Sequence, residues 1–385
     1  MPRKRQLVTF LTVFALILAT LHFYLYQRIA YYLQLDTPQR ALLAATFGLL
    51  ALLVLLVLPL SRMLPRTLAR VLAWVAYPWM GLGFLLCTGF LLTDCVWLIA
   101  NLLGIGAAPT ASLQRDFGVA ALGLIGCLGV YALWRALGPV RTREVTVHLK
   151  KLPPTLDGLR LAQISDIHIG PLLGGRWLRR VVARVNALEA DVVAITGDLA
   201  DGSVSELRAH VAPLGELRAR HGAYFVTGNH EYYSGVEAWC GHVEDLGITV
   251  LRNRHVSIGV AGEGIDIAGV DDWSSRHAPR GHDLSAALRG RDASRPLVLL
   301  AHQPLSMHEA AAHGVDLQLS GHTHGGQIWP FTYFVYLQQP IAQGLFQYPD
   351  ADLQIYVSPG TGFWGPPMRL GAWPEITCIT LRRMP

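Results

Sequence analysis

The chain has 385 residues, of which 52% are apolar and 15% are charged, and its mean hydropathy is +0.34. This composition excludes an intrinsically disordered chain, a collagen-like fibre and a small disulfide-stapled scaffold. Residues 1–140 contain 10 basic and 3 acidic side chains, whereas residues 141–385 contain 22 basic and 24 acidic ones. Because the C-terminal part lacks the basic stripe that nucleic-acid binding requires, we expect no nucleic-acid partner.

Residues 1–140 are predicted to form a transmembrane module of about four helices. Each candidate segment has about 20 almost uncharged residues, which is enough to cross the hydrocarbon core of a bilayer. The segments lie near residues 7–26, 41–60, 72–93 and 117–137, and a turn is expected after residue 93. Nine Lys and Arg residues fall on one side of this arrangement and three on the other, which favours both termini in the cytoplasm.

Asp94 and the cysteines give only weak indications of function. Asp94 is the one charge in residues 71–104, and it is interpreted either as a functional intramembrane acid or, with more support, as a helix-end residue near the headgroups. The chain has five cysteines, none in a zinc-binding or redox spacing, and we interpret them as small apolar side chains without a disulfide framework.

Residues 141–385 alternate between predicted strands and helices. A helix is predicted over residues 175–189, where Trp177, Val181 and Val185 recur at helical spacing. The apolar segments predicted as strands include residues 159–165, 191–196, 223–227, 297–301 and 316–320. Strands that are buried on both faces and joined by helices indicate a layered α/β domain.

Polar side chains directly follow five of these strands, and we expect them to converge because ligands bind beyond the carboxyl ends of strands in open α/β sheets. These candidate ligands are Asp166, His168, Asp198, Asn229, His302, His322 and His324. The mixture of carboxylate, amide and imidazole suits Mn, Fe, Zn or Co. Seven ligands are too many for one tetrahedral ion, so the sequence predicts two divalent metal ions bridged by one carboxylate, with Asp198 as the candidate. Two such ions can clamp a phosphoryl group.

The motifs that contain these residues resemble those of the calcineurin-like metallophosphoesterases. They are Asp166-x-His168, Gly197-Asp198, Gly228-Asn229-His230-Glu231, His302 and Gly321-His322-Thr323-His324. Gly325-Gly326-Gln327 and the stretch from Gly360 to Glu375 are similar to the bacterial membrane-anchored YaeI/YkuE-like branch. The resemblance covers about residues 145–383. It implies a four-layer α/β/β/α sandwich, which follows the N-terminal transmembrane helices predicted above. We expect a multi-pass protein of the bacterial inner (cytoplasmic) membrane.

The resemblance also implies a role for each residue of the site. Asp166, His168, Asp198 and His324 would hold one metal. Asp198, Asn229, His302 and His322 would hold the second. His230 would be the catalytic residue that faces the phosphate and protonates the leaving group or stabilises charge. Asp201 and Glu231 would orient the ligands.

These observations predict a membrane-bound phosphoesterase with two metals that hydrolyses a phosphodiester or pyrophosphate bond by attack of a metal-activated hydroxide on phosphorus. The alternative is a non-catalytic signalling or scaffold module on a membrane anchor. A transporter with an attached domain is a third hypothesis, supported by Asp94 alone. Oligomeric state is left open.

The segment after His324 suggests the class of substrate. Residues 325–349 contain no charge, and residues 329–373 contain 11 aromatic side chains. Because Trp and Tyr favour membrane–water interfaces, we expect a lipid-linked phosphate ester or pyrophosphate as substrate and the lipid bilayer as a partner. The alternative is that these rings fill the core under the last strands.

Overall fold

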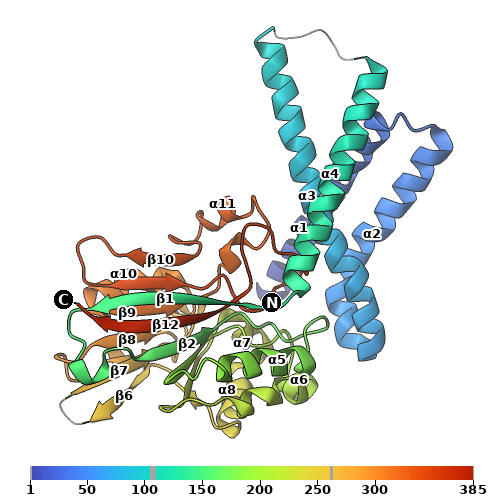
Figure 1. Ribbon diagram of the computed structural model, residues 1–385. Coiled ribbons are helices and arrows are strands. Elements are labelled where there is room, and N and C mark those ends of the chain that lie inside the picture. Colours follow the sequence, from blue (N-terminus) through green and yellow to red (C-terminus); the bar gives the residue numbers. More distant parts are fainter. Residues whose placement is uncertain (1, 105–109, 261–262, 385) are drawn as a thin grey trace. The chain divides into compact units, whose positions relative to one another are not determined.

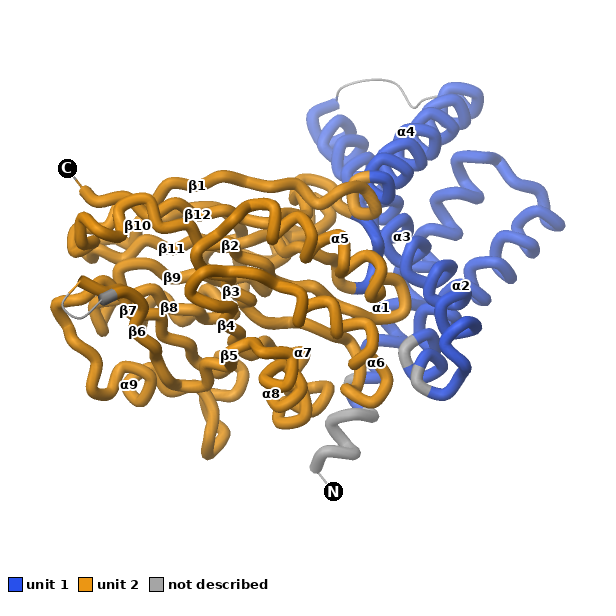
Figure 2. Tube along the Cα trace, turned by 60° about the horizontal axis from the view of Figure 1, so that its bottom comes forward, with its two compact units in different colours: residues 1–134, 365–368 blue, residues 135–364, 369–385 orange. Residues whose placement is uncertain are grey.

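The computed structural model describes residues 2–104, 110–260 and 263–384. It divides into two compact units, coloured separately in Figure 2. The first comprises residues 1–134 and 365–368, and the second comprises residues 135–364 and 369–385. The break after residue 134 lies close to the predicted boundary at residue 140.

The first unit contains four long helices, each long and apolar enough to cross a membrane. They are α1 (Pro2–Tyr32), α2 (Thr37–Met63), α3 (Arg66–Leu102) and α4 (Ala111–Leu137), of which α4 continues into the second unit. The prediction of four N-terminal apolar helices is confirmed.

Helix α3 differs from the expectation of a turn after residue 93, because it continues unbroken to Leu102. The charge of Asp94 is accommodated inside the helix pair α1–α3. Arg28 Nη2 lies 2.7 Å from Asp94 Oδ2, and the Tyr24 hydroxyl donates to the same oxygen at 2.7 Å. The sequence offered no clear partner for Asp94. The structure supplies two from one face of α1, so the acid requires no break in the helix.

The second unit is built on two six-stranded sheets (Figure 1). The first sheet has the order β1 (Arg141–Leu149), β12 (Glu375–Arg383), β2 (Arg160–Ile164), β3 (Val192–Thr196), β4 (Ala223–Val226) and β5 (Thr249–Val250). The second has the order β10 (Gly344–Gln347), β11 (Gln354–Val357), β9 (Leu317–Ser320), β8 (Leu297–Leu300), β7 (Glu263–Gly269) and β6 (Arg254–Val260). Strands β2 to β5 are mutually parallel, as are β7, β8, β9 and β11.

Helices cover the outer faces of both sheets. They are α5 (Gly175–Asn186), α6 (Val204–Val211) and α8 (Val236–Asp245) on the first sheet, and α9 (Leu284–Ala287) and α10 (Met307–Ala312) on the second. Two further short helices, α7 (Asn229–Ser234) and α11 (Thr332–Val335), lie in the segments that follow β4 and β9. One apolar core joins α5, α6 and α8 to the first sheet, a second lies between the two sheets, and a third joins α9 and α10 to the second sheet. Three cores between four layers confirm the predicted α/β/β/α sandwich.

Two edge strands have no counterpart in the sequence prediction. Strand β10 has one half-buried and three exposed residues, so it lacks an apolar run. Strand β6 pairs antiparallel with β7 and carries charged and polar residues at Arg254, His255 and Ser257. Both positions are at sheet edges, where one-sided burial leaves little apolar pattern to detect.

Candidate metal centre

The predicted ligands lie at five strand ends that meet where the two sheets face each other. Asp166 and His168 follow β2, Asp198 follows β3, and Asn229 begins α7 after β4. His302 follows β8, and His322 and His324 follow β9 in the other sheet. Cross-sheet hydrogen bonds join these loops: the His322 N–H donates to the Asp166 carboxylate at 3.0 and 3.1 Å, and the Gln163 amide donates to the Ser320 carbonyl.

The backbone at this site is unusual. Five of the seven predicted ligands have a positive φ, with values between 49° and 70°: Asp166, His168, Asp198, His322 and His324. Left-handed backbone is uncommon for residues other than glycine and is concentrated at functional sites, where packing must hold it in place. The turns aim these side chains toward one another instead of letting them continue the strand pattern.

The side chains converge in two overlapping groups. His324 Nε2 lies 3.4 Å from Asp166 Oδ1 and 3.1 Å from His168 Nε2. Asp198 Oδ2 lies 3.2 Å from His302 Nε2 and 3.8 Å from His168 Nε2. The ligand atoms of Asp198, His302 and His322 also lie within 4.8 Å of one another. Asp198 therefore lies between the group at β2 and the group at β8, the position that a bridging carboxylate requires.

Two orphaned polar atoms show that these residues fit a cation. Asn229 Oδ1 and His302 Nε2 are buried without a hydrogen-bond partner. His302 Nδ1 lies 2.7 Å from the Thr196 carbonyl and must donate to it, so in the neutral ring Nε2 presents a lone pair. That lone pair faces the Asp198 carboxylate, which is another acceptor. Buried acceptors that face each other are unfavourable unless a positive charge lies between them, supplied by a bound cation or by a proton on His302 Nε2. Burial alone would lower the pKa of His302, but the Asp198 charge outweighs it and raises this pKa well above its usual value, so the pair attracts positive charge.

His230 and His168 share one carboxylate. Asp201 Oδ1 accepts from His168 Nδ1 at 2.9 Å and from His230 Nδ1 at 2.7 Å. This fixes both rings with Nε2 toward Asp198, which lies 4.0 Å from the His230 nitrogen. Burial alone would lower the pKa of His230, but the bond to Asp201 and the charge of Asp198 outweigh it and raise this pKa to about 9. Protonated His230 can therefore donate a proton at neutral pH.

Asp198 is strongly biased toward its ionised form. Burial opposes ionisation, but the His302, His230 and His168 rings outweigh it and hold the pKa of Asp198 well below its usual range. An ionised bridging carboxylate is the form that binds divalent cations.

Glu231 ties two ligand loops together. Its Oε2 accepts from the Asp198 N–H at 3.0 Å and from the Gly228 N–H at 2.7 Å, and its Oε1 accepts from the Leu199 N–H at 2.8 Å. The approach of these loops requires glycine, because a Cβ on Gly228 would overlap Asp198 Oδ1. Glu231 thus positions Asp198 and the start of α7 through three backbone N–H groups.

Arg369 supports the loop of His324, a role that the sequence did not reveal. Its side chain is fully buried and donates to the carbonyls of His324, Pro359 and Gly362. Its Nη2 also lies 3.2 Å from His324 Nδ1. Burial lowers the pKa of this guanidinium to about 10. A single arginine in a long irregular segment has no motif that could have identified it.

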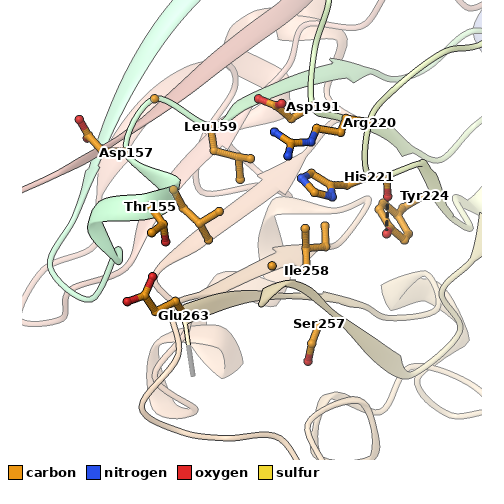
Figure 3. Close-up of a pocket in the computed structure, with 13 residues that line it drawn as sticks. Thr155, Asp157, Leu159, Asp191, Arg220, His221, Tyr224, Ser257, Ile258 and Glu263 are labelled. Atoms are coloured by element: carbon orange, nitrogen blue, oxygen red, sulfur yellow. Dashed lines mark hydrogen bonds between the residues drawn. The ribbon is translucent and has the colours of Figure 1, made fainter. Parts of the chain in front are cut away.

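A sizeable cavity lies elsewhere. It has a volume of about 770 Å³ and lies at the opposite ends of the strands, beside the starts of β3 and β4 and the β6–β7 hairpin. Figure 3 shows the acidic Asp157 and Glu263 on one side of it and Arg220 and His221 on the other. None of the predicted ligands lines it, so the ligand geometry, and not cavity size, locates the candidate metal centre.

Comparisons with known proteins agree with this geometry. The family model for calcineurin-like phosphoesterases matches residues 159–326. The uncharacterized metallophosphoesterase YkuE of Bacillus subtilis is 32% identical over 280 residues, which cover 70% of this chain and 96% of that protein. The chain belongs to the calcineurin-like metallophosphoesterase family. This confirms the resemblance seen in the motifs.

Some metallophosphoesterase relatives combine this domain with a membrane part. A Danio rerio protein named "Transmembrane protein with metallophosphoesterase domain" is 41% identical over 274 residues, which cover 69% of this chain and 62% of that protein. The chain thus matches about three fifths of the length of such relatives. Among solved structures, the NAD nucleotidase of Haemophilus influenzae gives a TM-score of 0.37 at 18% identity, covering 58% of this chain and 49% of that one. A likeness at that level adds nothing on function.

Proposed function

We propose that the protein is a membrane-anchored phosphoesterase that uses two divalent metal ions. Asp166, His168, Asp198 and His324 would hold one ion, and Asp198, Asn229, His302 and His322 the other. The observation that carries the proposal is the convergence of buried Asp and His side chains in overlapping groups around Asp198. Two buried polar atoms without a hydrogen-bond partner, Asn229 Oδ1 and His302 Nε2, support it. Bound ions of this class neutralise phosphoryl charge and activate water at neutral pH.

His230 is proposed as the general acid. Its Nδ1 is committed to Asp201, which leaves Nε2 to face the site with a proton available for the leaving oxygen. The side chain remains 14% exposed, whereas His168 and His302 are enclosed. A partly accessible histidine beside enclosed ligands is placed to meet an incoming phosphate ester.

A lipid-linked phosphodiester or pyrophosphate is proposed as the substrate, because an apolar lip adjoins the centre. We define the lip by its exposed side chains, Phe331, Tyr333, Phe334, Tyr336 and Leu337, which are 49–79% exposed. Of the 11 aromatic residues between 329 and 373, only Tyr356 and Phe363 are buried, so most do not fill the core.

Hydrogen bonds attach the lip to the loop of His324. Thr332 Oγ1 in α11 donates to the Gly325 carbonyl at 2.9 Å. Trp364 is also exposed, and its ring centroid lies 5.8 Å from that of His230. Exposed rings beside a catalytic centre favour a substrate with an apolar portion.

The metallophosphoesterase domain is proposed to lie in the cytoplasm, in a multi-pass protein of a bacterial inner membrane. The nine-to-three asymmetry of basic residues supports this orientation.

Hydrolysis by the full-length protein in detergent micelles tests the proposal. We expect a chelator to abolish turnover of both bis-p-nitrophenyl phosphate and UDP-diacylglucosamine. The double variant Phe334→Ser, Tyr336→Ser should lower kcat/KM for the lipid substrate about tenfold or more, since each ring loses roughly 1–2 kcal/mol of apolar contact. Turnover of the small diester and the melting temperature should stay nearly unchanged. Equal losses on both substrates would refute the lipid assignment, and turnover that survives metal removal would refute the metal-dependent mechanism.

A further inference from the structure

Helix α5 carries a concentrated positive charge. Four of its twelve residues are arginines, at positions 176, 179, 180 and 184, and the helix contains no acidic residue. Its apolar face, which includes Leu178, Val181 and Val185, is buried against the first sheet. The arginines are therefore all exposed on the other side of the helix.

A groove lies between α5 and the segment that leaves α4. It has a volume of about 450 Å³ and is lined by Leu137, Gly138, Pro139 and Val140 on one side. On the other side it is lined by Trp177, Arg180, Val181, Ala183 and Arg184 of α5. Both sides belong to the same compact unit.

The groove begins where an apolar helix ends. Leu137 is the last residue of α4, whose 27 residues are long and apolar enough to cross a membrane. The Arg184 guanidinium donates to the Val140 carbonyl, and Ala136 and Val140 share a core with Val181 and Val185. These contacts fix α5 beside the helix end, at the level where lipid headgroups begin.

The chemistry of the groove matches a phospholipid headgroup. Arg180 and Arg184 are four residues apart and so lie on one face of the helix. Among the described residues Arg180 has no acidic partner, whereas Arg179 on the adjacent face lies 3.5 Å from Glu216. Trp177 is half-buried and Leu137 is 43% exposed, so apolar surface lies beside the two guanidinium groups. Guanidinium groups bind phosphate through paired hydrogen bonds, and basic pockets at helix ends bind anionic lipids.

We propose that this groove binds the headgroup of an anionic phospholipid, with the phosphate at Arg180 and Arg184 and the glycerol and first acyl carbons against Trp177 and Leu137. The site rests on the membrane location in the proposed function but not on hydrolysis. It would fix the height and tilt of the metallophosphoesterase domain at the bilayer surface, and so the approach of the domain to membrane-embedded substrates.

Lipid titration followed by native mass spectrometry tests this site. The full-length protein carries Asp198→Ala to prevent turnover, and phosphatidylglycerol is compared with phosphatidylcholine. We expect the double variant Arg180→Gln, Arg184→Gln to weaken binding of the first phosphatidylglycerol molecule by about 20-fold, since each basic residue near a membrane contributes roughly fivefold to the affinity. The matched control Arg176→Gln, Arg179→Gln removes the same charge from the same helix outside the groove and should change binding less than about threefold. Neither double variant should change phosphatidylcholine binding.

Three results would overturn the proposal. They are no preference for phosphatidylglycerol over phosphatidylcholine, an equal loss in both double variants, or competition by glycerol phosphate as strong as by the intact lipid. The last would identify a soluble phosphate compound as the ligand. Because Arg184 also bonds Val140, Arg180→Gln alone, with an unchanged melting temperature, keeps the test valid if the double variant is unstable. If protein with the native Asp198 shows no phosphoesterase turnover while lipid binding stays selective, the proposed hydrolysis is refuted and this site still stands.

Discussion

Replacing Glu231 with glutamine should destabilise the metallophosphoesterase domain and weaken metal binding together. The Glu231 side chain is fully buried and accepts three backbone N–H groups from the loops that follow β3 and β4. One oxygen accepts from the N–H groups of Asp198 and Gly228, and the other accepts from the N–H group of Leu199. A glutamine of the same shape can keep one of these oxygens but must present an NH₂ group in place of the other.

The size of the stability loss follows from the hydrogen-bond acceptor that Glu231→Gln removes. If the amide oxygen keeps the two bonds to Asp198 and Gly228, the new NH₂ group faces the Leu199 N–H, which leaves buried donors without an acceptor. A buried unsatisfied polar group reduces the free energy of unfolding by about 1–3 kcal/mol. For a domain of this size each kcal/mol lowers the melting temperature by about 2–4 °C, so we expect a decrease of roughly 2–10 °C.

The assay is thermal unfolding at pH 8 with and without added Mn²⁺, accompanied by elemental analysis. Burial and the nearby Asp198 raise the pKa of Glu231 to about 7, so at pH 8 the native side chain is ionised. Glu237→Gln is the matched control, because Glu237 lies on the neighbouring helix α8, its side chain is 78% exposed and it pairs with Arg252. Its melting temperature should change by less than about 2 °C, since exposed ion pairs contribute little. If Glu231→Gln matched this control in both stability and metal content, the carboxylate would not hold the loops as argued.

The two remaining variants separate metal binding from acid catalysis. Asp198→Ala removes the carboxylate shared by the two groups of ligands, so bound metal should fall below one ion per chain with near-complete loss of turnover; two ions retained at saturating metal would exclude a bridging role. His230→Ala should keep its metal and lose about 100- to 10,000-fold in kcat, with a smaller loss for p-nitrophenyl esters, whose leaving groups need little protonation. Loss of metal in that variant would identify His230 as a ligand, and His308→Ala, an exposed histidine, serves as the control.

The sequence predicted those features of the fold and the site that leave a local pattern of residues. Strands buried on both faces appear as continuous apolar runs, and a polar residue directly after such a run marks its carboxyl end. Because parallel strands of one sheet end at the same edge, Asp166, Asp198 and Asn229 could be brought together without knowledge of strand order. The order itself, with β12 between β1 and β2, has no local signature and came from the structure.

Contacts between distant segments had no such signature. The pair Arg28–Asp94 joins two helices whose sequences are otherwise apolar, and nothing local shows that the two charges face each other. Arg369 reaches His324 across 45 positions of chain, from a segment without regular structure. In both cases the role of a single polar residue depends on its buried surroundings, and the sequence alone does not show those surroundings.

The candidate metal centre draws its residues from both sheets, so neither sheet could form it alone. Asp166, Asp198 and Asn229 come from the first sheet, whereas His302 and the β9 loop come from the second. Neither sheet alone offers the complete set of ligands that we propose for either ion, and left-handed turns at these residues are unfavourable unless surrounding contacts hold them. The apolar core between the sheets, with Leu161, Val298 and Leu319 fully buried, supplies those contacts. We therefore expect the stability of that core and the occupancy of the proposed metal centre to be coupled. Bound cations would stabilise the stacked sheets by linkage, and the stacked sheets preorganise the buried acceptors that such cations require.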